Sequence, residues 1–381
     1  MLNHSRYVQK KNIFRSGSVH VVICWAVLQA VLLAVHGINI DGEAGKYVYE
    51  ANRLLLGESL SGNNFIFYIV SIALIFASIK AGAGFYLAIL VQLLLNLLAT
   101  VSFYRLTRRL SDKRTATIFT LVLIFFYPYQ QFNVFLQTES IYYSLVLLLT
   151  CYLLNLSSLS AQSLIHILLF LTVLTVTRPT GLLLSIPTFL YLHYRFIAPK
   201  YHFRIIPVYV AALIAGAVLF NRILGSGGEL NFILPFVQEH IICGVPTRPV
   251  TGTTFSPEDN SITGILNYFV SHPGQVLRLG IVKSGYFFGV YRDYFSPLHN
   301  TLKVSAFMVL YVFVIIGTVK WFHQKKILLV FPFTLIFLTW MTVVFTCDDW
   351  HNRFVLCLIP SFLLLALPAG RSLTNKKLST H

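Results

Sequence analysis

The sequence predicts an all-α polytopic membrane protein with about ten transmembrane helices and two large extracytoplasmic loops that carry interfacial helices. Of its 381 residues 56% are hydrophobic and only 11% are charged, whereas a soluble domain has roughly 25% charged residues. Apolar runs recur along the whole chain, and a helix needs about 20 apolar residues to cross a bilayer. These runs leave no room for a sizeable soluble domain, so we expect one transmembrane domain over residues 1–381.

The apolar runs have clear limits along most of the chain. The predicted spans are residues 19–38, 84–104, 115–129, 134–154, 163–177, 180–195, 205–220, 302–319, 327–346 and 353–369. The first run lacks a small-residue cleavage site after it, so we expect a retained signal anchor rather than a cleaved peptide.

Segment 65–79 is apolar but short, and loop charge decides its placement. If it lies at the membrane surface, both termini are cytoplasmic, and most of the 29 basic residues, including those of "RLTRRLSDKR", lie on the cytoplasmic side. This arrangement obeys the positive-inside rule, and a spanning 65–79 would reverse it. The net charge of +16 is therefore attributed to orienting loops, and no nucleic-acid partner is expected.

The same topology places two large loops, residues 39–83 and 221–301, on the outer face. Within the second, "QVLRLGIVKSGYFFGVY" has the pattern of an amphipathic helix that lies at the bilayer surface. All but one of the 13 acidic residues, the exception being Asp112, then lie on the outer side. We interpret this bias as a sign of function on the outer face. The chain contains no P-loop, no HExxH and no GxSxG motif.

Asp41 and Glu43 follow the first span and precede a predicted surface helix over Lys46–Leu56. Acids near a helix start are favourable in themselves. For Glu50 and Glu58 we expect such ordinary solvated positions, whereas Asp41 and Glu43 are candidates for chemistry.

Three further polar positions carry candidate site residues. Glu139 falls within the fourth predicted span, where an ionised carboxylate needs a partner, a buried ion pair or a wet cleft. In "TVTRPTG", Arg178 lies in an outer turn that Pro179 forces, and its guanidinium either binds a phosphate or snorkels to the interface.

The last outer turn, "TCDDWHNRF", holds Asp348, Asp349, His351 and Arg353. The carboxylates suit a divalent cation such as Mg²⁺ or Mn²⁺, and Arg353 suits a phosphate; the alternative is a polar end-cap of the span. His272 and Lys283 are weaker candidates beside the predicted surface helix of the second loop.

The five cysteines include no CxxC pair, so a zinc site is not expected. Cys24, Cys151 and Cys357 fall within apolar runs and are expected to pack there. Cys243 and Cys347 both fall on the predicted outer face, where disulfides persist. They are either a disulfide that ties the large loop to the last outer turn or two unpaired thiols.

Taken together, these segments resemble the GT-C superfamily of integral-membrane glycosyltransferases, in particular the bacterial relatives of protein O-mannosyltransferases and of the lipid A aminoarabinose transferase. The family pattern of an acid after the first span, then a tyrosine, an alanine and a glycine, matches Asp41, Tyr47, Ala51 and Gly57. "LQTESIYYSLVLLL", "TRPTG", "SHPGQVLRLGIVKSGYFF" and "RFVLCLIP" are similar to further family segments, in the same order.

The resemblance implies an inverting glycosyl transfer from a polyprenyl-phosphate sugar to a glycan, lipid or protein acceptor at the extracytoplasmic face of a bacterial inner membrane. A first-loop carboxylate would be the general base. Arg178, Arg353 and Lys283 would stabilise the leaving phosphate, and Glu139 would bind a metal, orient the acceptor or assist the base. The family often has adjacent acids here, but Gly42 separates Asp41 from Glu43, so the base is left open between them.

Two other functions fit the same composition. An O-antigen polymerase or ligase also uses many spans, a large outer loop and arginines, with a lipid diphosphate donor. A lipid-linked sugar flippase would need polar residues deep in several spans, and beyond Glu139 the sequence has few.

Overall fold

The computed structural model describes residues 2–197, 207, 211, 214, 216, 218, 221, 233–247 and 260–376, with the side chains of residues 18–371 among them. Its described part is helical, and its only β pairing consists of two isolated bridges, Asn39 with Phe135 and Ile242 with Asp348. The all-helical expectation is therefore confirmed.

Within the described ranges, five helices are long and apolar enough to cross a membrane, or up to six if one bent pair counts as a span. They are Ser18–His36, Asn63–Lys80, Tyr86–Leu110, Pro297–Gln324 and Ile327–Phe345, and the bent pair is Trp350–Leu356 with Ile359–Arg371. These apolar helices are what a membrane protein is expected to have, so the structure is compatible with a membrane protein.

The other predicted spans fall on shorter helices or largely outside the described residues. Spans 134–154 and 163–177 fall on apolar helices of 17 residues each. Spans 115–129 and 180–195 fall on helices of 13 and 12 residues, and span 205–220 falls largely outside the described residues. The count of ten stays a prediction, as does the surface position of 65–79, because Asn63–Lys80 meets the length and composition of a span.

The chain forms two compact units. Unit 1 comprises Met1–Leu190, Leu310–Pro332 and Ile359–His381, and unit 2 comprises Tyr191–Val309 and Phe333–Leu358. The division passes through the two long helices α14 (Pro297–Gln324) and α15 (Ile327–Phe345).

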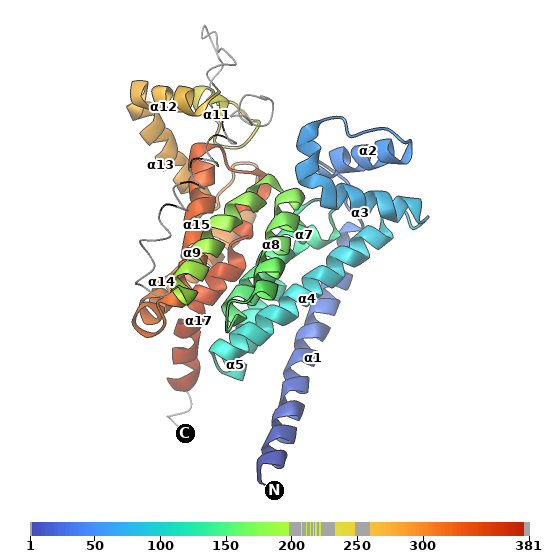
Figure 1. Ribbon diagram of the computed structural model, residues 1–381, viewed down its shortest axis with the longest axis vertical. Coiled ribbons are helices and arrows are strands. Elements are labelled where there is room, and N and C mark those ends of the chain that lie inside the picture. The colour runs from blue at the N-terminus through green and yellow to red at the C-terminus, as the bar shows by residue number, and fades with distance from the viewer. Residues whose placement is uncertain are drawn as a thin grey trace. The chain divides into compact units, whose positions relative to one another are not determined.

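Unit 1 is a helical bundle that begins with the long helix α1 (Figure 1). In that view α2 and α3 lie at the end of α1 opposite the N-terminus, and α3 runs across the direction of α1. The elements are α1 (Leu2–His36), α2 (Ala44–Leu55), η1 (Asn63–Tyr68), α3 (Ile69–Lys80), α4 (Tyr86–Leu110), α5 (Lys113–Phe125), α6 (Tyr127–Gln130), η2 (Gln131–Val134), α7 (Glu139–Asn155), α8 (Ala161–Thr177), η3 (Pro179–Leu184), α17 (Ile359–Lys376), the first half of α9 (Ser185–Phe196), the second part of α14 and the start of α15.

Polar side chains join the helices of unit 1 inside the bundle. The indole N–H of Trp25 donates to Asn96 Oδ1 at 2.8 Å, which ties α1 to α4. The side chain of Gln29 donates to Gln130 Oε1 at 3.1 Å, and Asn133 Nδ2 donates to the same oxygen at 2.8 Å. Such interhelical hydrogen bonds satisfy groups that lipid cannot.

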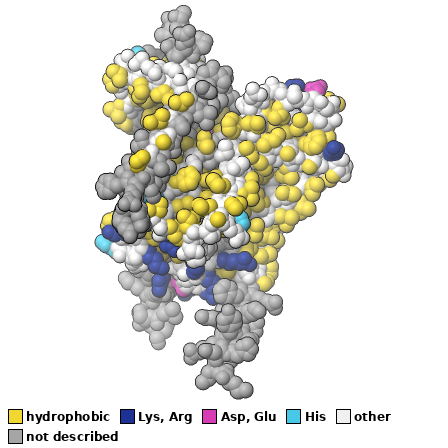
Figure 2. Space-filling view, in the orientation of Figure 1, with side chains coloured by type: hydrophobic (Ala, Val, Ile, Leu, Met, Phe, Trp, Pro, Cys, Tyr) yellow, Lys and Arg dark blue, Asp and Glu magenta, His cyan; other side chains and the backbone are white. Residues whose placement is uncertain are grey.

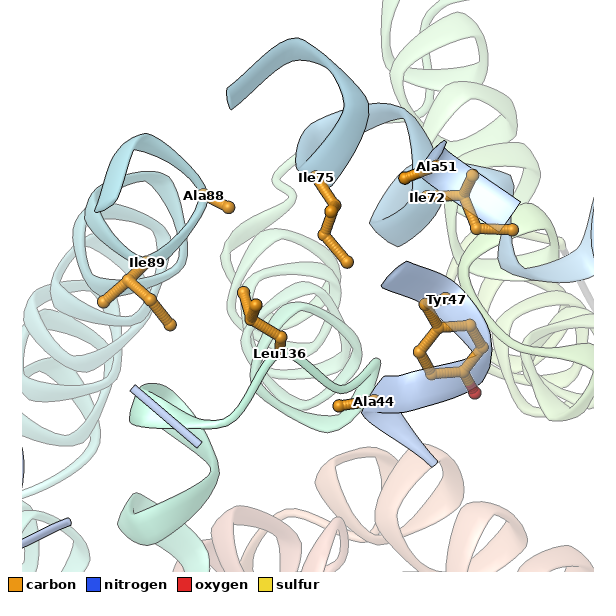
Figure 3. Close-up of a cluster of buried hydrophobic side chains, with 8 residues drawn as sticks. All are labelled: Ala44, Tyr47, Ala51, Ile72, Ile75, Ala88, Ile89 and Leu136. Carbon is orange, nitrogen blue, oxygen red and sulfur yellow. The ribbon is translucent and has the colours of Figure 1, made fainter. Parts of the chain in front are cut away.

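A buried apolar cluster packs the segment after α1 onto the bundle (Figure 3). In the close-up, Leu136 lies between Ala88 and Ile89 of α4 on one side and Ala44 and Tyr47 of α2 on the other. Ile72 and Ile75 of α3 and Ala51 of α2 complete the cluster. Because it includes Leu136, which lies three residues before Glu139, this packing holds α2 near the start of α7.

Unit 2 is built mainly on short helices: α11 (Leu234–Val237), α12 (Ile262–Ser271), α13 (Pro273–Gly289), η7 (Trp350–Asn352) and α16 (Arg353–Leu356), together with parts of α9, α14 and α15. The Ser261 hydroxyl caps α12 by accepting from Gly264 N at 3.0 Å. The predicted surface helix corresponds to α13.

The surface shown in Figure 2 is largely apolar, with hydrophobic side chains spread over the helices and few charges among them. Exposed apolar residues lie along α4 and α8 of unit 1, for example Leu94, Leu98, Ile165, Leu168 and Leu169. Exposed apolar helix faces of this extent are expected where helices meet lipid rather than water.

Candidate functional site

The segment after α1 places Asp41 beside the chain that leads into α7. Gly37 has φ +61°, a left-handed conformation that favours glycine and that turns the chain out of α1. Asn39 N then donates to Val134 O at 2.9 Å, and Leu136 N donates to Asn39 O at 3.0 Å. Gln137 Nε2 donates to Asp41 O at 3.4 Å. The first-loop acid is thus held next to the residues that precede Glu139.

Asp41 and Glu43 have different surroundings. Asp41 is exposed, and its Oδ2 accepts from Asn39 Nδ2 at 3.2 Å. Glu43 precedes the first residue of α2, and its carboxylate lies 3.5 Å from Lys46 Nζ. The Lys46 ammonium also lies over the rings of Tyr47 and Tyr68, 5.8 and 5.7 Å from their centroids.

Glu139 is the first residue of α7, whereas the predicted span 134–154 begins five residues earlier. The segment before it is broken into α6 and η2, with Pro128 in the first turn of α6, so regular helix starts only at Glu139. A carboxylate at a helix N-terminus is favoured by the helix dipole. The side chain is nevertheless fully buried, so it needs a cation.

Arg178 supplies that cation. Its Nη1 lies 2.6 Å from Glu139 Oε1, in a bond where the guanidinium donates and the carboxylate accepts. Arg178 ends α8, and η3 follows at Pro179. A Cβ at Gly181 would lie 2.2 Å from Leu174 O, so only glycine lets this turn fold back onto α8. The turn that the sequence predicted therefore aims Arg178 at Glu139, which is the buried ion pair the sequence left as one alternative for Glu139.

Tyr47 connects these groups electrostatically. Its side chain is buried, and the pKa of its phenol is raised far above the ordinary value, first by burial and then by the carboxylates of Glu43 and Glu139. Arg178 acts in the opposite direction. Asp41, Glu43, Tyr47, Glu139 and Arg178 therefore occupy one region of unit 1, which we name the first-loop site.

Two other acids near α2 have structural roles. Glu50 is buried rather than solvated, contrary to expectation, because its carboxylate accepts from Ser61 N at 2.9 Å and from the Ser61 hydroxyl. It thereby anchors the loop that follows α2. Glu58 is exposed, as expected, and lies 3.0 Å from Arg53 Nε.

In unit 2, Lys283 lies inside α13 and is fully buried. Its ammonium donates to Thr346 O and lies 4.5 Å from the centroid of the Phe236 ring. Burial lowers the pKa of Lys283 to about 7. His272 is the exposed residue that directly precedes α13; its side chain does not cap the helix, and its ring stacks on Tyr268.

The turn between α15 and α16 holds the carboxylates of two ion pairs. Asp348 is fully buried and paired with Arg292; burial raises the pKa of this carboxyl, and Arg292 opposes the rise. Asp349 Oδ1 accepts from Arg353 Nη2 at 2.5 Å. His351 is exposed, and its backbone N donates to the Tyr294 hydroxyl at 2.9 Å. Both acids thus have arginine partners.

Arg292 is a residue that the sequence analysis missed. It lies in "GVYRDYFSP", a polar interruption among aromatics just after the predicted surface helix. An arginine among aromatic residues was the sequence signal that could have identified it. Among the described residues, no group of three or more His, Cys, Asp or Glu side chains is placed to hold a metal ion.

Cys243 and Cys347 form a disulfide across 104 positions of sequence, with a Cα–Cα distance of 5.1 Å. Backbone pairing supports the join, because Cys243 N donates to Asp348 O at 2.9 Å and Asp348 N donates to Ile241 O at 2.8 Å. The bridge fixes residues 241–243 to the turn that carries Asp348.

Comparison with known proteins finds no matching family model, no matching curated protein and no matching solved structure.

Proposed function

We propose that this chain is a membrane glycosyltransferase that moves a sugar from a polyprenyl-phosphate donor to a hydroxyl acceptor at the outer face of a membrane. The proposal rests on the first-loop site and on the ordered motifs that resemble the GT-C superfamily. Bacterial inner membrane, with both termini in the cytoplasm, is the location that fits the charge distribution of the loops.

One observation carries the proposal. The segment with Asp41 pairs with the segment that precedes Glu139, and Glu139 is joined to Arg178. Three motifs that are about 40 to 140 residues apart in sequence therefore meet in one place. An exposed carboxylate beside a buried carboxylate–arginine pair is an arrangement in which a base and a phosphate ligand can serve one substrate.

Asp41 is the proposed general base. Its carboxylate takes the proton of the acceptor hydroxyl while the acceptor oxygen forms a bond to the anomeric carbon. The bond from that carbon to the phosphate oxygen breaks, and the electron pair leaves with polyprenyl phosphate. Attack from the opposite face inverts the anomeric centre. Glu43 is the weaker candidate because its carboxylate already faces Lys46.

Arg178 is the proposed ligand of the leaving phosphate. Glu139 orients the guanidinium through Nη1, and a guanidinium is the side-chain group that matches the geometry of phosphate oxygens. Charge on the leaving phosphate grows as the bond breaks, so a fixed cation stabilises the transition state. Lys283 and Arg353, the other cations expected in this role, are buried in unit 2 and donate to Thr346 O and to Asp349. The proposal therefore assigns the leaving phosphate to Arg178, and a divalent cation is proposed only as an addition to it.

The experiment supplies purified protein with a panel of polyprenyl-phosphate sugars and a hydroxyl acceptor, and measures released polyprenyl phosphate. We expect release by the wild type from one donor class and loss of release in Asp41→Asn. Glu58→Gln is the matched control because it removes an exposed carboxylate from the end of α2.

Release that survives in Asp41→Asn, in Glu43→Gln and in the double variant would overturn the proposal. Turnover of a lipid-diphosphate donor alone would favour a polymerase or ligase. Movement of the lipid-linked sugar across a vesicle membrane without cleavage would favour a flippase.

A further inference from the structure

A groove lined by basic residues lies at the opposite end of unit 1 from the first-loop site. It has a volume of about 440 Å³, and Lys320, Lys325 and Arg371 line it. The other lining residues are Leu110, Ser111, Trp321, Gln324, Leu367 and Pro368. They come from the ends of α4, α14 and α17, so three helices that are distant in sequence converge on the groove.

The groove is held by close helix contacts. A Cβ at Gly317 would lie 2.1 Å from Leu365 O, so the backbones of α14 and α17 touch one turn before Lys320. A Cβ at Gly370 would lie 2.4 Å from the Phe119 ring, which brings α17 against α5 next to Arg371. Trp321 is buried beside the groove, and its indole N–H donates to Leu364 O at 3.1 Å. The walls are therefore packed before any ligand arrives.

The charge of the groove is of one sign. Its lining includes three basic side chains and no carboxylate. Asp112, the nearest acid in sequence, accepts from Thr115 N at 2.9 Å and from the Thr115 hydroxyl at 2.7 Å, so its carboxylate is engaged in capping α5. Three cations converging on one hollow favour an anion with several oxygen atoms, such as a phosphate.

The position of the groove indicates that the phosphate belongs to a lipid. About 22 residues of α4 separate Ala88, which packs beside α2, from Leu110 at the groove. At 1.5 Å per residue this is roughly 33 Å, close to the thickness of the hydrocarbon core. The exposed apolar side chains Ile315, Ile316, Val319 and Phe322 lie along α14 up to the groove. A lipid can therefore place its headgroup in the groove and its acyl chains along α14.

We propose that this groove binds the phosphate headgroup of an anionic phospholipid at the membrane face opposite the first-loop site. Lys320, Lys325 and Arg371 bind the phosphate oxygens, and Ser111 and Gln324 offer hydrogen bonds to the glycerol part. Basic pockets between transmembrane helices bind anionic headgroups through this chemistry. This site does not depend on the proposed glycosyl transfer.

The test is native mass spectrometry of the purified full chain titrated with phosphatidylglycerol, with phosphatidylcholine and with inorganic phosphate. We expect phosphatidylglycerol adducts on the wild type, and a dissociation constant that is at least roughly tenfold higher when Lys320, Lys325 and Arg371 are all changed to Gln. The charge-retaining variant with Lys320→Arg, Lys325→Arg and Arg371→Lys keeps the adducts.

The matched control changes Lys113, Arg114 and Lys326 to Gln. These exposed residues are close in sequence to Ser111 and Lys325 of the groove. Together they carry the same total charge as Lys320, Lys325 and Arg371, and they do not line the groove. We expect this control to alter the dissociation constant less than about twofold. If the groove variant does not elute as a single species, Lys325→Gln against Lys326→Gln repeats the comparison at exposed positions.

Three results would overturn the proposal. They are equal weakening by the groove variant and the control, equal affinity for phosphatidylcholine, and displacement of the lipid by inorganic phosphate, which would assign the groove to a soluble anion.

Discussion

Asp41 and Glu43 stand two residues apart but have unequal freedom to act on a substrate. Asp41 is exposed and held from its backbone by Gln137, whereas Glu43 faces Lys46 across 3.5 Å. Glu139 and Arg178 are buried together 2.6 Å apart. A buried pair contributes to folding as well as to any chemistry, so stability and transfer have to be measured separately for these residues.

Arg178→Gln is expected to lower stability because it leaves the Glu139 carboxylate buried without its guanidinium. The expected loss is roughly 3–5 kcal/mol, the range for breaking a buried ion pair. Thermal unfolding in detergent measures it. Arg53→Gln, which removes a partner of exposed Glu58, is the control and should cost less than about 1 kcal/mol.

The double variant Glu139→Gln with Arg178→Gln completes the cycle. Because both charges are then removed, it should lose less stability than the two single variants together. Additive losses would show that the pair is not coupled.

The lowered pKa of Lys283 predicts that the stability of the protein depends on pH. Its pKa in the folded protein is about 7, below the ordinary value of 10.5. Between these values the unfolded chain binds more protons, so the contribution of Lys283 to stability rises with pH; below pH 7 the cost of the buried ammonium is fully present. The melting temperature of the wild type relative to Lys283→Met should therefore rise between about pH 7 and pH 9.5.

The control for that measurement is Arg278→Gln, which lies on the same helix with an exposed side chain. Its difference from the wild type should not change over the same range. Parallel curves for wild type and Lys283→Met would show that the ammonium is not buried as described.

At the scale of elements, close backbone contacts fix how helices meet. Gly317 and Gly181 both occupy positions where a Cβ would overlap a carbonyl oxygen. A contact between elements also explains the position of Asp41. The short backbone pairing of residue 39 with 134–136 connects the end of α1 to the start of α7. Removing such a contact changes the position of a whole element rather than of one side chain.

Gly317→Ala tests this packing. The new Cβ would lie 2.1 Å from Leu365 O, so α14 and α17 must separate, and we expect a loss of at least about 1–3 kcal/mol. Gly285→Ala in α13 is the control, because a Cβ there meets nothing within 4 Å and should be neutral or stabilise by roughly 0.5–1 kcal/mol. Equal melting temperatures for the two variants would contradict the described contact.

Sequence patterns predicted the individual elements of the site better than the contacts between them. The helix after Asp41, the turn at Arg178 and the helix that contains Lys283 follow from local patterns of charge, proline and apolar spacing. The partner of Glu139, the burial of Glu50 and the partner of Asp348 do not. Each of these depends on a contact between residues distant in sequence, with Arg178, Ser61 and Arg292 being 39, 11 and 56 residues away.

At the scale of the whole molecule, the central question is which way the chain crosses the membrane. Five helices are long and apolar enough to span it, or up to six with the bent pair, and Asn63–Lys80 is one of the five. If that segment lies at the surface, the α4–α5 turn with its arginines and lysines faces the cytoplasm. If it spans, the same turn faces outward, against the positive-inside rule.

Reporter fusions decide between the two arrangements. We expect green fluorescent protein fused after Ser111 to fluoresce, because that position is then cytoplasmic, and alkaline phosphatase fused there to be inactive. A fusion after Gly62 is the shared control, because both arrangements place it outside. Active phosphatase after Ser111 would make Asn63–Lys80 a span and would reverse the side assigned to every later loop.

The most direct test of the proposed transfer concerns Asp41. A base that is not needed for binding can be lost without loss of donor affinity. The measurement is therefore donor affinity together with polyprenyl phosphate release, for wild type and Asp41→Asn, with the donor that the wild type uses. We predict unchanged donor affinity and release reduced at least roughly 100-fold in the variant. Release at the wild-type rate by Asp41→Asn would contradict the assignment of Asp41 as the base of the proposed transfer.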